Sequence, residues 1–227
     1  MPEGFSKAAV IGTGLMGGSL ALALKDRPEI VSVRGYDISA ETRRKAVALG
    51  VVDVAADSPE EAAAGCGLVF IATPVSEVVR SFAGIAGALD AGTVVTDVAS
   101  TKLGITEAIE KISPSGVCYV GGHPMTGSEQ SGVEYARADL YRDRYYVLTP
   151  TASTDTEAYR RLHGLLKDMG ARVISMDPRS HDLAMATISH VPHLLSLILM
   201  NMADRQRSQM KNLFTIAAGG FRDMTRI

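Results

Sequence analysis

Short apolar runs recur along the first 176 residues and alternate with segments of helical composition. Strands of a parallel sheet that is covered on both faces read as nearly continuous apolar runs, so each run predicts a buried strand. The predicted strands are residues 7–11, 31–36, 51–55, 68–72, 93–98, 117–120, 144–149 and 172–176. The predicted helices are 19–25, one from about 40, 59–64, 76–89, 133–141 and 155–169. This alternation predicts an α/β fold of the Rossmann type.

The strand signals stop at Asp177, and residues 177–227 are helical by composition. Two apolar runs, 194–200 and 213–218, are separated there by a hydrophilic stretch, 204–212. We therefore predict a domain boundary near Met176, with a dinucleotide-binding domain at 1–176 and an all-helical domain at 177–227.

The first predicted strand ends in a glycine turn that opens a predicted helix. A G-x-G-x-x-G pattern between a strand and a helix predicts a dinucleotide site, whereas the same glycines alone would indicate only a flexible turn. Gly12 permits the tight turn, Gly14 lets the backbone approach a pyrophosphate, and Gly17 lets the helix pack closely on the strand. Leu15 and Met16, inside the turn, are predicted to contact the cofactor as well.

Asp37 ends the second predicted strand, 20 residues beyond Gly17. A carboxylate at this spacing binds the adenosine ribose hydroxyls and repels a 2′-phosphate, which favours NAD over NADP. The alternative role for Asp37 is an N-cap of the helix that follows. NADP stays open because three nearby arginines, Arg34, Arg43 and Arg44, could attract a phosphate.

Polar residues follow three more of the predicted strands, and the carboxyl ends of parallel strands share one edge of a sheet. We therefore expect Thr73, Ser100 and His123 to lie near Gly12 and Asp37. Thr73 and Pro74 are predicted to line the cofactor site, and the alternative is that they only form the turn at the end of the strand.

His123 lies in a glycine- and proline-rich segment, 121–129, that predicts a loop. An imidazole with an ordinary pKa of about 6.5 suits a proton acceptor near neutral pH, although a loop histidine at a helix start has the same local pattern.

Two other segments carry chemistry. His190 and His193 share a helix face around Pro192, but no nearby cysteine or carboxylate motif completes a zinc site, and both could simply cap or pack a helix start. The last nine residues, GGFRDMTRI, suit either a solvated turn or a site where an arginine binds a carboxylate through two hydrogen bonds.

Composition narrows the class of protein. The 227 residues are 46% apolar and 21% charged, which is ordinary for a globular protein, and the net charge of -2 argues against nucleic-acid binding. Cys66 and Cys118 lie in or beside apolar runs and read as buried thiols of a reducing compartment. With no signal peptide and no uninterrupted apolar run of about 18 residues, we expect a cytoplasmic protein without a membrane span.

Together these features resemble the prephenate/arogenate dehydrogenase family of tyrosine biosynthesis. The resemblance covers nearly the whole chain and is most specific in three segments, in this order: the GHPMTGSE stretch at 122–129, SHVPH at 189–193 and the terminal GGFRDMTRI. The glycine turn and residues 97–102 also match, although the turn is common to many families.

The resemblance implies an NAD-dependent oxidative decarboxylation of prephenate or arogenate. In the family pattern His123 matches the catalytic histidine and Ser100 the serine that orients it. The positions that match substrate-contacting or pocket-framing residues are Ser128, Glu129, His190, His193, Asp223 and Arg226. The resemblance also implies a homodimer formed through a helical domain that continues for several dozen residues, so we expect the domain at 177–227 to be incomplete.

Two other readings stay open. A β-hydroxyacid dehydrogenase or imine-type reductase shares the glycine turn and a helical second domain. The first of these relies on a lysine in its helical domain, and here only Lys211 follows Lys167. The other reading is a nucleotide-sensing module without catalysis. The residues do not separate prephenate from arogenate, and tyrosine feedback is equally open.

Overall fold

The computed structural model describes residues 5–210 and 212–226. The chain divides into two compact units, Met1–His181 and Asp182–Ile227. In the first unit, α-helices alternate with the strands of one eight-stranded sheet, which confirms the predicted α/β architecture.

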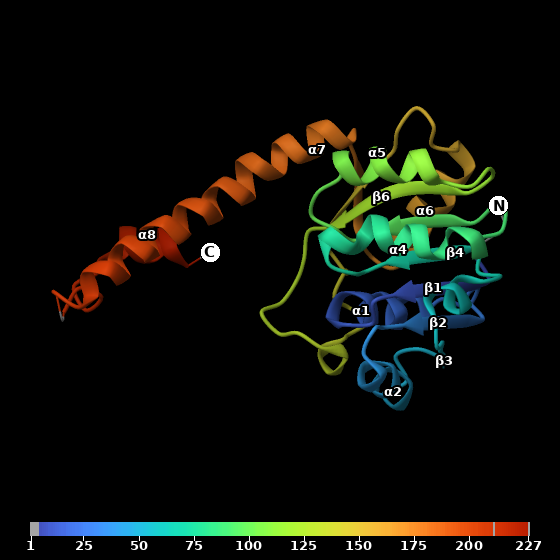
Figure 1. The fold of residues 1–227 in the computed structure, drawn as a ribbon, viewed down its shortest axis with the longest axis horizontal. Helices are drawn as coiled ribbons and strands as arrows, with labels where there is room; N and C mark the ends of the chain where they lie inside the picture. Colours follow the sequence, from blue (N-terminus) through green and yellow to red (C-terminus); the bar gives the residue numbers. More distant parts are fainter. Residues whose placement is uncertain (1–4, 211, 227) are drawn as a thin grey trace. The chain divides into compact units, whose positions relative to one another are not determined.

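The sheet has the strand order β3-β2-β1-β4-β5-β6-β7-β8 (Figure 1). The strands are β1 (Lys7–Ile11), β2 (Ser32–Tyr36), β3 (Val54–Ala55), β4 (Leu68–Ile71), β5 (Val94–Asp97), β6 (Cys118–Pro124), β7 (Tyr145–Thr149) and β8 (Arg172–Ser175). All pairings from β3 to β6 are parallel, whereas β7 runs antiparallel to β6 and parallel to β8. The carboxyl ends of β2, β1, β4, β5 and β6 therefore share one edge of the sheet.

The helices of the first unit cover both faces of the sheet. They are α1 (Leu15–Lys25), α2 (Ala40–Ala48), α3 (Pro59–Ala63), η1 (Val75–Glu77), α4 (Val78–Ile85), η2 (Ala86–Ala88), α5 (Leu103–Ile112), η3 (Val133–Tyr135) and α6 (Thr156–Asp168). Side chains alternate along each strand, so Val10 joins the core with Leu20 of α1, while Ile11 joins the other core with Phe82 of α4. This two-sided burial explains why the strands read as continuous apolar runs.

Three local predictions need correction. His123 lies in a strand rather than a loop, because β7 supplies main-chain partners to Gly121–Pro124 despite the glycines and the proline. The helix predicted at 133–141 shrinks to η3, and Tyr141 turns inward, where its hydroxyl donates to the carbonyl of Met16 at 2.7 Å. No helix was predicted over α5, which buries Ile105 and Ile109.

The second unit is helical as predicted. It continues the helix of α7 (Pro178–Met185) through η4 (Ala186–His190) into α8 (Val191–Arg207), and α9 (Gly219–Thr225) packs against α8. Phe214, in the segment between α8 and α9, lies beside Phe221 of α9, with ring centroids 6.4 Å apart. The segment η4 is a turn of π-helix. Pro192 has no N–H to donate to the carbonyl four residues earlier, and a widened turn accommodates this missing bond.

The continuous helix Pro178–Arg207 is 30 residues long, with an 18-residue window of mean hydropathy 1.6 that is only 11% buried. By length and composition, this helix could cross a membrane. Core helices and helices at protein interfaces have the same properties. Its exposed large apolar side chains include Leu194, Leu195, Leu197, Ile198 and Met202.

Candidate active site

The glycine turn between β1 and α1 is built as the sequence predicts. Gly12 has a φ of +94°, which favours glycine, and a Cβ there would lie 2.6 Å from the carbonyl oxygen of Ala72. A Cβ on Gly17 would lie 1.9 Å from the carbonyl oxygen of Gly12, so only glycine lets α1 pack this closely on the turn. Both positions therefore set the geometry of the fold.

Gly14 differs from the other two glycines of the turn, Gly12 and Gly17. A Cβ added there would meet no protein atom within 4 Å, so the fold itself does not require glycine at this position. Gly14 is the N-cap of α1, and no side chain caps the helix or adds negative charge in its first turn. The open space above Gly14 and the N–H groups at the start of α1 together fit the pyrophosphate of a dinucleotide.

Asp37 lies at the end of β2, beside the glycine turn. Its Oδ2 accepts the N–H of Thr13 at 3.0 Å, and its Oδ1 accepts the N–H of Ser39 at 3.0 Å. Asp37 is not the N-cap of α2, because Ser39 occupies that position and its hydroxyl accepts the N–H of Thr42. The carboxylate is thus held against the turn, where it can accept hydrogen bonds from the ribose hydroxyls.

The three arginines that could attract a 2′-phosphate have different surroundings. Arg34 points to the end of α3, where Nη1 donates to the carbonyl of Ala64 at 2.9 Å. Arg43 donates to the main-chain carbonyl of Asp37 at 2.8 Å and lies over the ring of Tyr36. Arg44 lines a hollow between α2 and β3 together with Arg43. Only Arg43 contacts the residue expected to bind the ribose.

Thr73 and Pro74 follow β4 at the same edge of the sheet. The hydroxyl of Thr73 lies 3.2 Å from that of Ser81 on α4, and Pro74 is exposed at the start of η1. Both residues lie next to Ala72, whose carbonyl group Gly12 approaches closely. Their position suits a wall of the cofactor site.

A fully buried ion pair lies beneath the edge where β5 and β6 end. The ammonium group of Lys102 donates to Oδ2 of Asp97, and both side chains are 0% exposed. The hydroxyl of Tyr119 donates to Oδ1 of Asp97 at 2.9 Å. Burial raises the pKa of Tyr119 well above its usual range, and the nearby Asp97 carboxylate adds to this shift. The phenol therefore stays protonated and remains a donor.

The same pair holds the main chain of Gly122. Asp97 Oδ1 accepts the N–H of Gly122 at 3.0 Å, and Lys102 donates to the carbonyl of Gly122 at 2.7 Å. The main-chain pairing of β5 with β6 ends at Thr96 and Val120. Beyond that point the side chains of Asp97 and Lys102 supply the hydrogen bonds to the main chain of β6. They fix the strand one residue before His123. Sequence reasoning gave Asp97 and Lys102 no such role; the signal was a strand-end carboxylate followed five residues later by a lysine.

His123 contacts a second histidine of the same unit. Its Nδ1 lies 2.9 Å from Nε2 of His181, which is in α7, and the two rings meet edge to face at 71°. His181 is 0% exposed, whereas His123 is partly exposed. Sequence reasoning missed His181, for which the only signal was a histidine just after the last predicted strand.

The other residues expected near His123 in the first unit lie after β5 and β6. Ser100 is half-buried and comes three residues after Asp97, at the edge of the sheet that carries His123. Ser128 and Glu129 are exposed in the segment after β6, where the Ser128 hydroxyl accepts the N–H of Gln130 at 3.1 Å.

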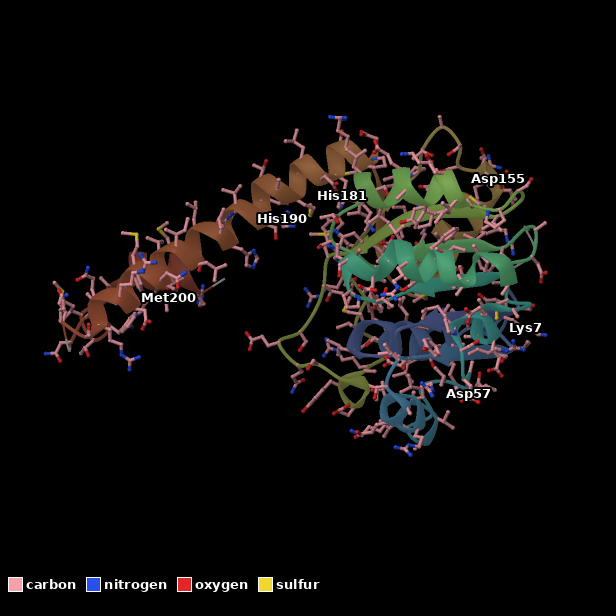
Figure 2. The ribbon with its side chains drawn as sticks, in the orientation of Figure 1. Lys7, Asp57, Asp155, His181, His190 and Met200 are labelled. Atoms are coloured by element: carbon pink, nitrogen blue, oxygen red, sulfur yellow. The ribbon has the colours of Figure 1, made fainter. Side chains whose placement is uncertain are left out.

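Four expected substrate contacts belong to the second unit. His190 lies in η4, and Figure 2 labels it on the helix that carries His181. His193 is exposed on α8, and its Nδ1–H donates to the carbonyl of Ser189 at 2.8 Å, which leaves Nε2 as the acceptor nitrogen. Asp223 on α9 and Arg226 just after it are exposed.

Residues 5–210 and 212–226 contain no group of three or more histidine, cysteine or acidic side chains placed to hold a metal ion. In the described part of the chain Cys66 and Cys118 are free thiols, and burial raises the pKa of each. Lys211, the one lysine of the helical part, and Ile227 lie outside the described residues.

Two family models match the chain. Residues 20–175 match "Prephenate dehydrogenase, nucleotide-binding domain", and residues 177–227 match "Prephenate dehydrogenase, dimerization domain". The prephenate dehydrogenase of Bacillus subtilis is 38% identical over 217 residues, which are 95% of this chain and 58% of the relative. The chain thus spans less than two thirds of that relative.

Two solved structures are similar over most of the chain. Prephenate dehydrogenase of Aquifex aeolicus, in complex with hydroxyphenyl propionate and NAD+, superposes with a TM-score of 0.88 at 32% identity, covering 97% of this chain and 77% of that one. Arogenate dehydrogenase of Synechocystis gives a TM-score of 0.84 at 32% identity, covering 97% of this chain and 78% of that one.

Proposed function

Because the chain belongs to the prephenate dehydrogenase family, we propose that it catalyses the NAD-dependent oxidative decarboxylation of prephenate to 4-hydroxyphenylpyruvate, or of arogenate to tyrosine. The observation that carries the proposal is the position of His123 at the end of β6, on the edge of the sheet that also holds the glycine turn and Asp37. This edge is where open α/β sheets bind dinucleotides and their substrates.

NAD is the proposed cofactor, and the residues at the glycine turn fit it. The start of α1 and the space above Gly14 suit the pyrophosphate, and the Asp37 carboxylate suits the ribose hydroxyls. Bound NAD would supply the hydride acceptor. Arg43 already donates to the main chain of Asp37, beside a carboxylate that would repel a 2′-phosphate, which supports NAD over NADP.

His123 is the proposed acceptor of the proton on the substrate's ring hydroxyl. As hydride leaves the carbon that bears this hydroxyl, the oxygen becomes more acidic, and a nearby imidazole can take its proton. Loss of carbon dioxide then makes the ring aromatic and leaves a phenol oxygen that takes the proton back. The protein therefore supplies a positioned base, and aromatisation supplies the driving force.

The remaining roles are proposals that follow the family pattern. Ser100 would orient His123 and the substrate hydroxyl. His193, with its Nε2 set as an acceptor, and His190 would contact substrate, and Arg226 would bind a carboxylate through its planar guanidinium fork. Ser128, Glu129 and Asp223 would frame the entrance to the pocket.

The proposed assembly is a cytoplasmic homodimer formed by the second unit. Residues 177–227 match the dimerization domain, and the exposed apolar side chains of α8 suit burial against a second copy.

A β-hydroxyacid dehydrogenase remains the second enzymatic reading. A 3-hydroxyisobutyrate dehydrogenase from Mycobacterium tuberculosis superposes with a TM-score of 0.64, but at 21% identity this similarity shows the fold alone.

The test is an absorbance assay at 340 nm that combines prephenate or arogenate with NAD or NADP. We expect turnover with NAD and at least one of the two substrates, and the preferred substrate chooses between the two reactions. A protein that binds NAD by calorimetry but turns over neither substrate would instead be a nucleotide-sensing module.

His123→Asn tests the proposed base. The amide cannot accept and hold a proton, so we expect kcat to fall by about 10²- to 10⁴-fold while NAD binding is retained. His163→Asn is the matched control, because His163 lies on α6 against Tyr159 and has no proposed role. Full activity in His123→Asn would remove this histidine from the mechanism.

A further inference from the structure

His181 is placed rigidly beside His123. It lies in the first turn of α7, where its main-chain N–H donates to the carbonyl of Asp177 at 3.0 Å. The Asp177 carboxylate accepts the N–H of Ser180 at 3.0 Å, which caps the same turn. The side chain of His181 is fully buried, and its Nε2 faces Nδ1 of His123 at 2.9 Å. Helix start and burial together hold this ring in one orientation.

A hydrogen bond between two imidazoles fixes where their protons lie. One nitrogen of the pair must donate and the other must accept. If His123 donates from Nδ1, its Nε2 carries a lone pair and can accept a proton. If His181 donates from Nε2, the neutral ring of His123 carries its proton on Nε2 and cannot act as a base there.

We propose that His181 is a positioning residue that accepts the Nδ1–H of His123 and so presents Nε2 of His123 to the substrate hydroxyl. This inference rests on the proposed role of His123 as the proton acceptor. His181 thus has the function that a carboxylate has beside the histidine of a hydrolase triad: it selects the tautomer and fixes the ring plane.

The burial of His181 also determines which of the two rings the substrate can reach. His181 is fully buried, whereas His123 is partly exposed, so His123 is the ring of the pair that can meet the substrate hydroxyl. In the proposed arrangement Nε2 of His123 takes the proton from substrate, while Nδ1–H of His123 keeps its hydrogen bond to His181. The proton on Nε2 remains available for return to the phenol oxygen.

The first test reads the tautomer directly and needs no activity. Long-range ¹H–¹⁵N NMR spectra of the chain without substrate, recorded at a pH where the rings are neutral, distinguish a protonated from an unprotonated ring nitrogen. We expect His123 to show a protonated Nδ1 and an unprotonated Nε2. The opposite pattern, with Nε2 protonated, would overturn the proposal. Spectra of His163→Gln assign the unrelated histidine.

The second test compares His181→Gln with His181→Ala. The side-chain amide of glutamine can place an oxygen near the position of Nε2 and accept the same hydrogen bond, whereas alanine cannot. We expect His181→Ala to lower kcat about 10- to 100-fold with little change in KM, and His181→Gln to recover most of this loss. His163→Gln should match the parent protein.

The outcomes separate this proposal from the proposed function. Unchanged kcat in a folded His181→Ala protein would exclude the positioning role. An equal loss in the glutamine and alanine variants would reduce His181 to a packing residue and also overturn the proposal. If the parent protein turns over neither prephenate nor arogenate, the proposed function fails, yet the NMR spectra still decide whether His181 sets the tautomer of His123.

Discussion

Lys102 donates a hydrogen bond to the carbonyl of Gly122 at 2.7 Å, immediately before His123 in β6. Its ammonium group also pairs with Asp97, so one buried lysine joins the end of β5 to the strand that carries the proposed base. Buried charges of this kind contribute little net stability as a pair, but the removal of one partner leaves the other charge uncompensated.

Lys102→Met should therefore be strongly destabilising. We expect the free energy of unfolding to fall by about 3–5 kcal/mol, measured by urea denaturation. Lys111→Met, at an exposed position of the same helix α5, is the control and should change little. The double variant Asp97→Asn with Lys102→Met should regain part of the loss, because no buried carboxylate is then left unpaired. A double variant as unstable as Lys102→Met would contradict this explanation.

Gly14 and Gly17 should respond differently to the same substitution. Gly14→Ala adds a methyl group where no protein atom lies within 4 Å, so the fold should tolerate it while the methyl group crowds the pyrophosphate. We expect the Kd for NAD, measured by calorimetry, to rise about 10-fold or more with the melting temperature nearly unchanged. In Gly17→Ala the methyl group meets the Gly12 carbonyl, so the melting temperature itself should fall. Equal thermal losses in both variants would refute the distinction.

Asp53 makes stability depend on pH. Burial alone would raise its pKa, but hydrogen bonds from Lys25 at 2.7 Å and from the N–H of Val33 at 2.8 Å outweigh burial and hold the pKa below its ordinary value. A carboxyl group with a lowered folded-state pKa stabilises the fold above its unfolded pKa of about 3.9. This contribution is lost as the pH falls through the folded pKa.

Asp53→Asn should therefore be less stable than the parent at pH 7, and the two proteins should converge as the pH falls below about 4. Denaturation curves at several pH values measure the difference. The exposed Asp90 gives the control variant Asp90→Asn, which should follow the parent across the range. A gap between parent and Asp53→Asn that stays constant down to pH 2 would show that the carboxylate charge is not the cause.

The apolar surface of α8 should control assembly. Leu197 is 61% exposed, and in a homodimer formed by the second unit Leu197→Glu would bury a charge at the interface. We expect analytical ultracentrifugation to show dimers of the parent protein and a shift of at least 10-fold toward monomer in the variant. Arg205→Glu, near the polar end of α8, should remain dimeric. Binding of the parent to lipid vesicles in place of dimer formation would contradict the proposed interface.

The order of local elements could be predicted from the sequence because it depends on short-range patterns. Apolar runs identified all eight strands of the sheet, and the glycine turn with Asp37 predicts which edge of the sheet binds the cofactor. Parallel pairing places every strand end with the same polarity at one edge, so the neighbourhood of His123 followed from the topology.

Only the tertiary structure decided the environment of His123. The strand that contains it forms because β7, which follows η3 in the chain, pairs antiparallel with Gly121–Pro124 and overrides their turn-forming composition. Lys102 and His181 reach the site through folding from positions whose local sequence signals do not specify a role, and a buried charge or a buried imidazole is recognised only by what surrounds it. The sequence by itself determined which residues could do the chemistry. The tertiary contacts determined which nitrogen of His123 faces a partner, because hydrogen-bond geometry depends on distances that spacing along a chain does not contain.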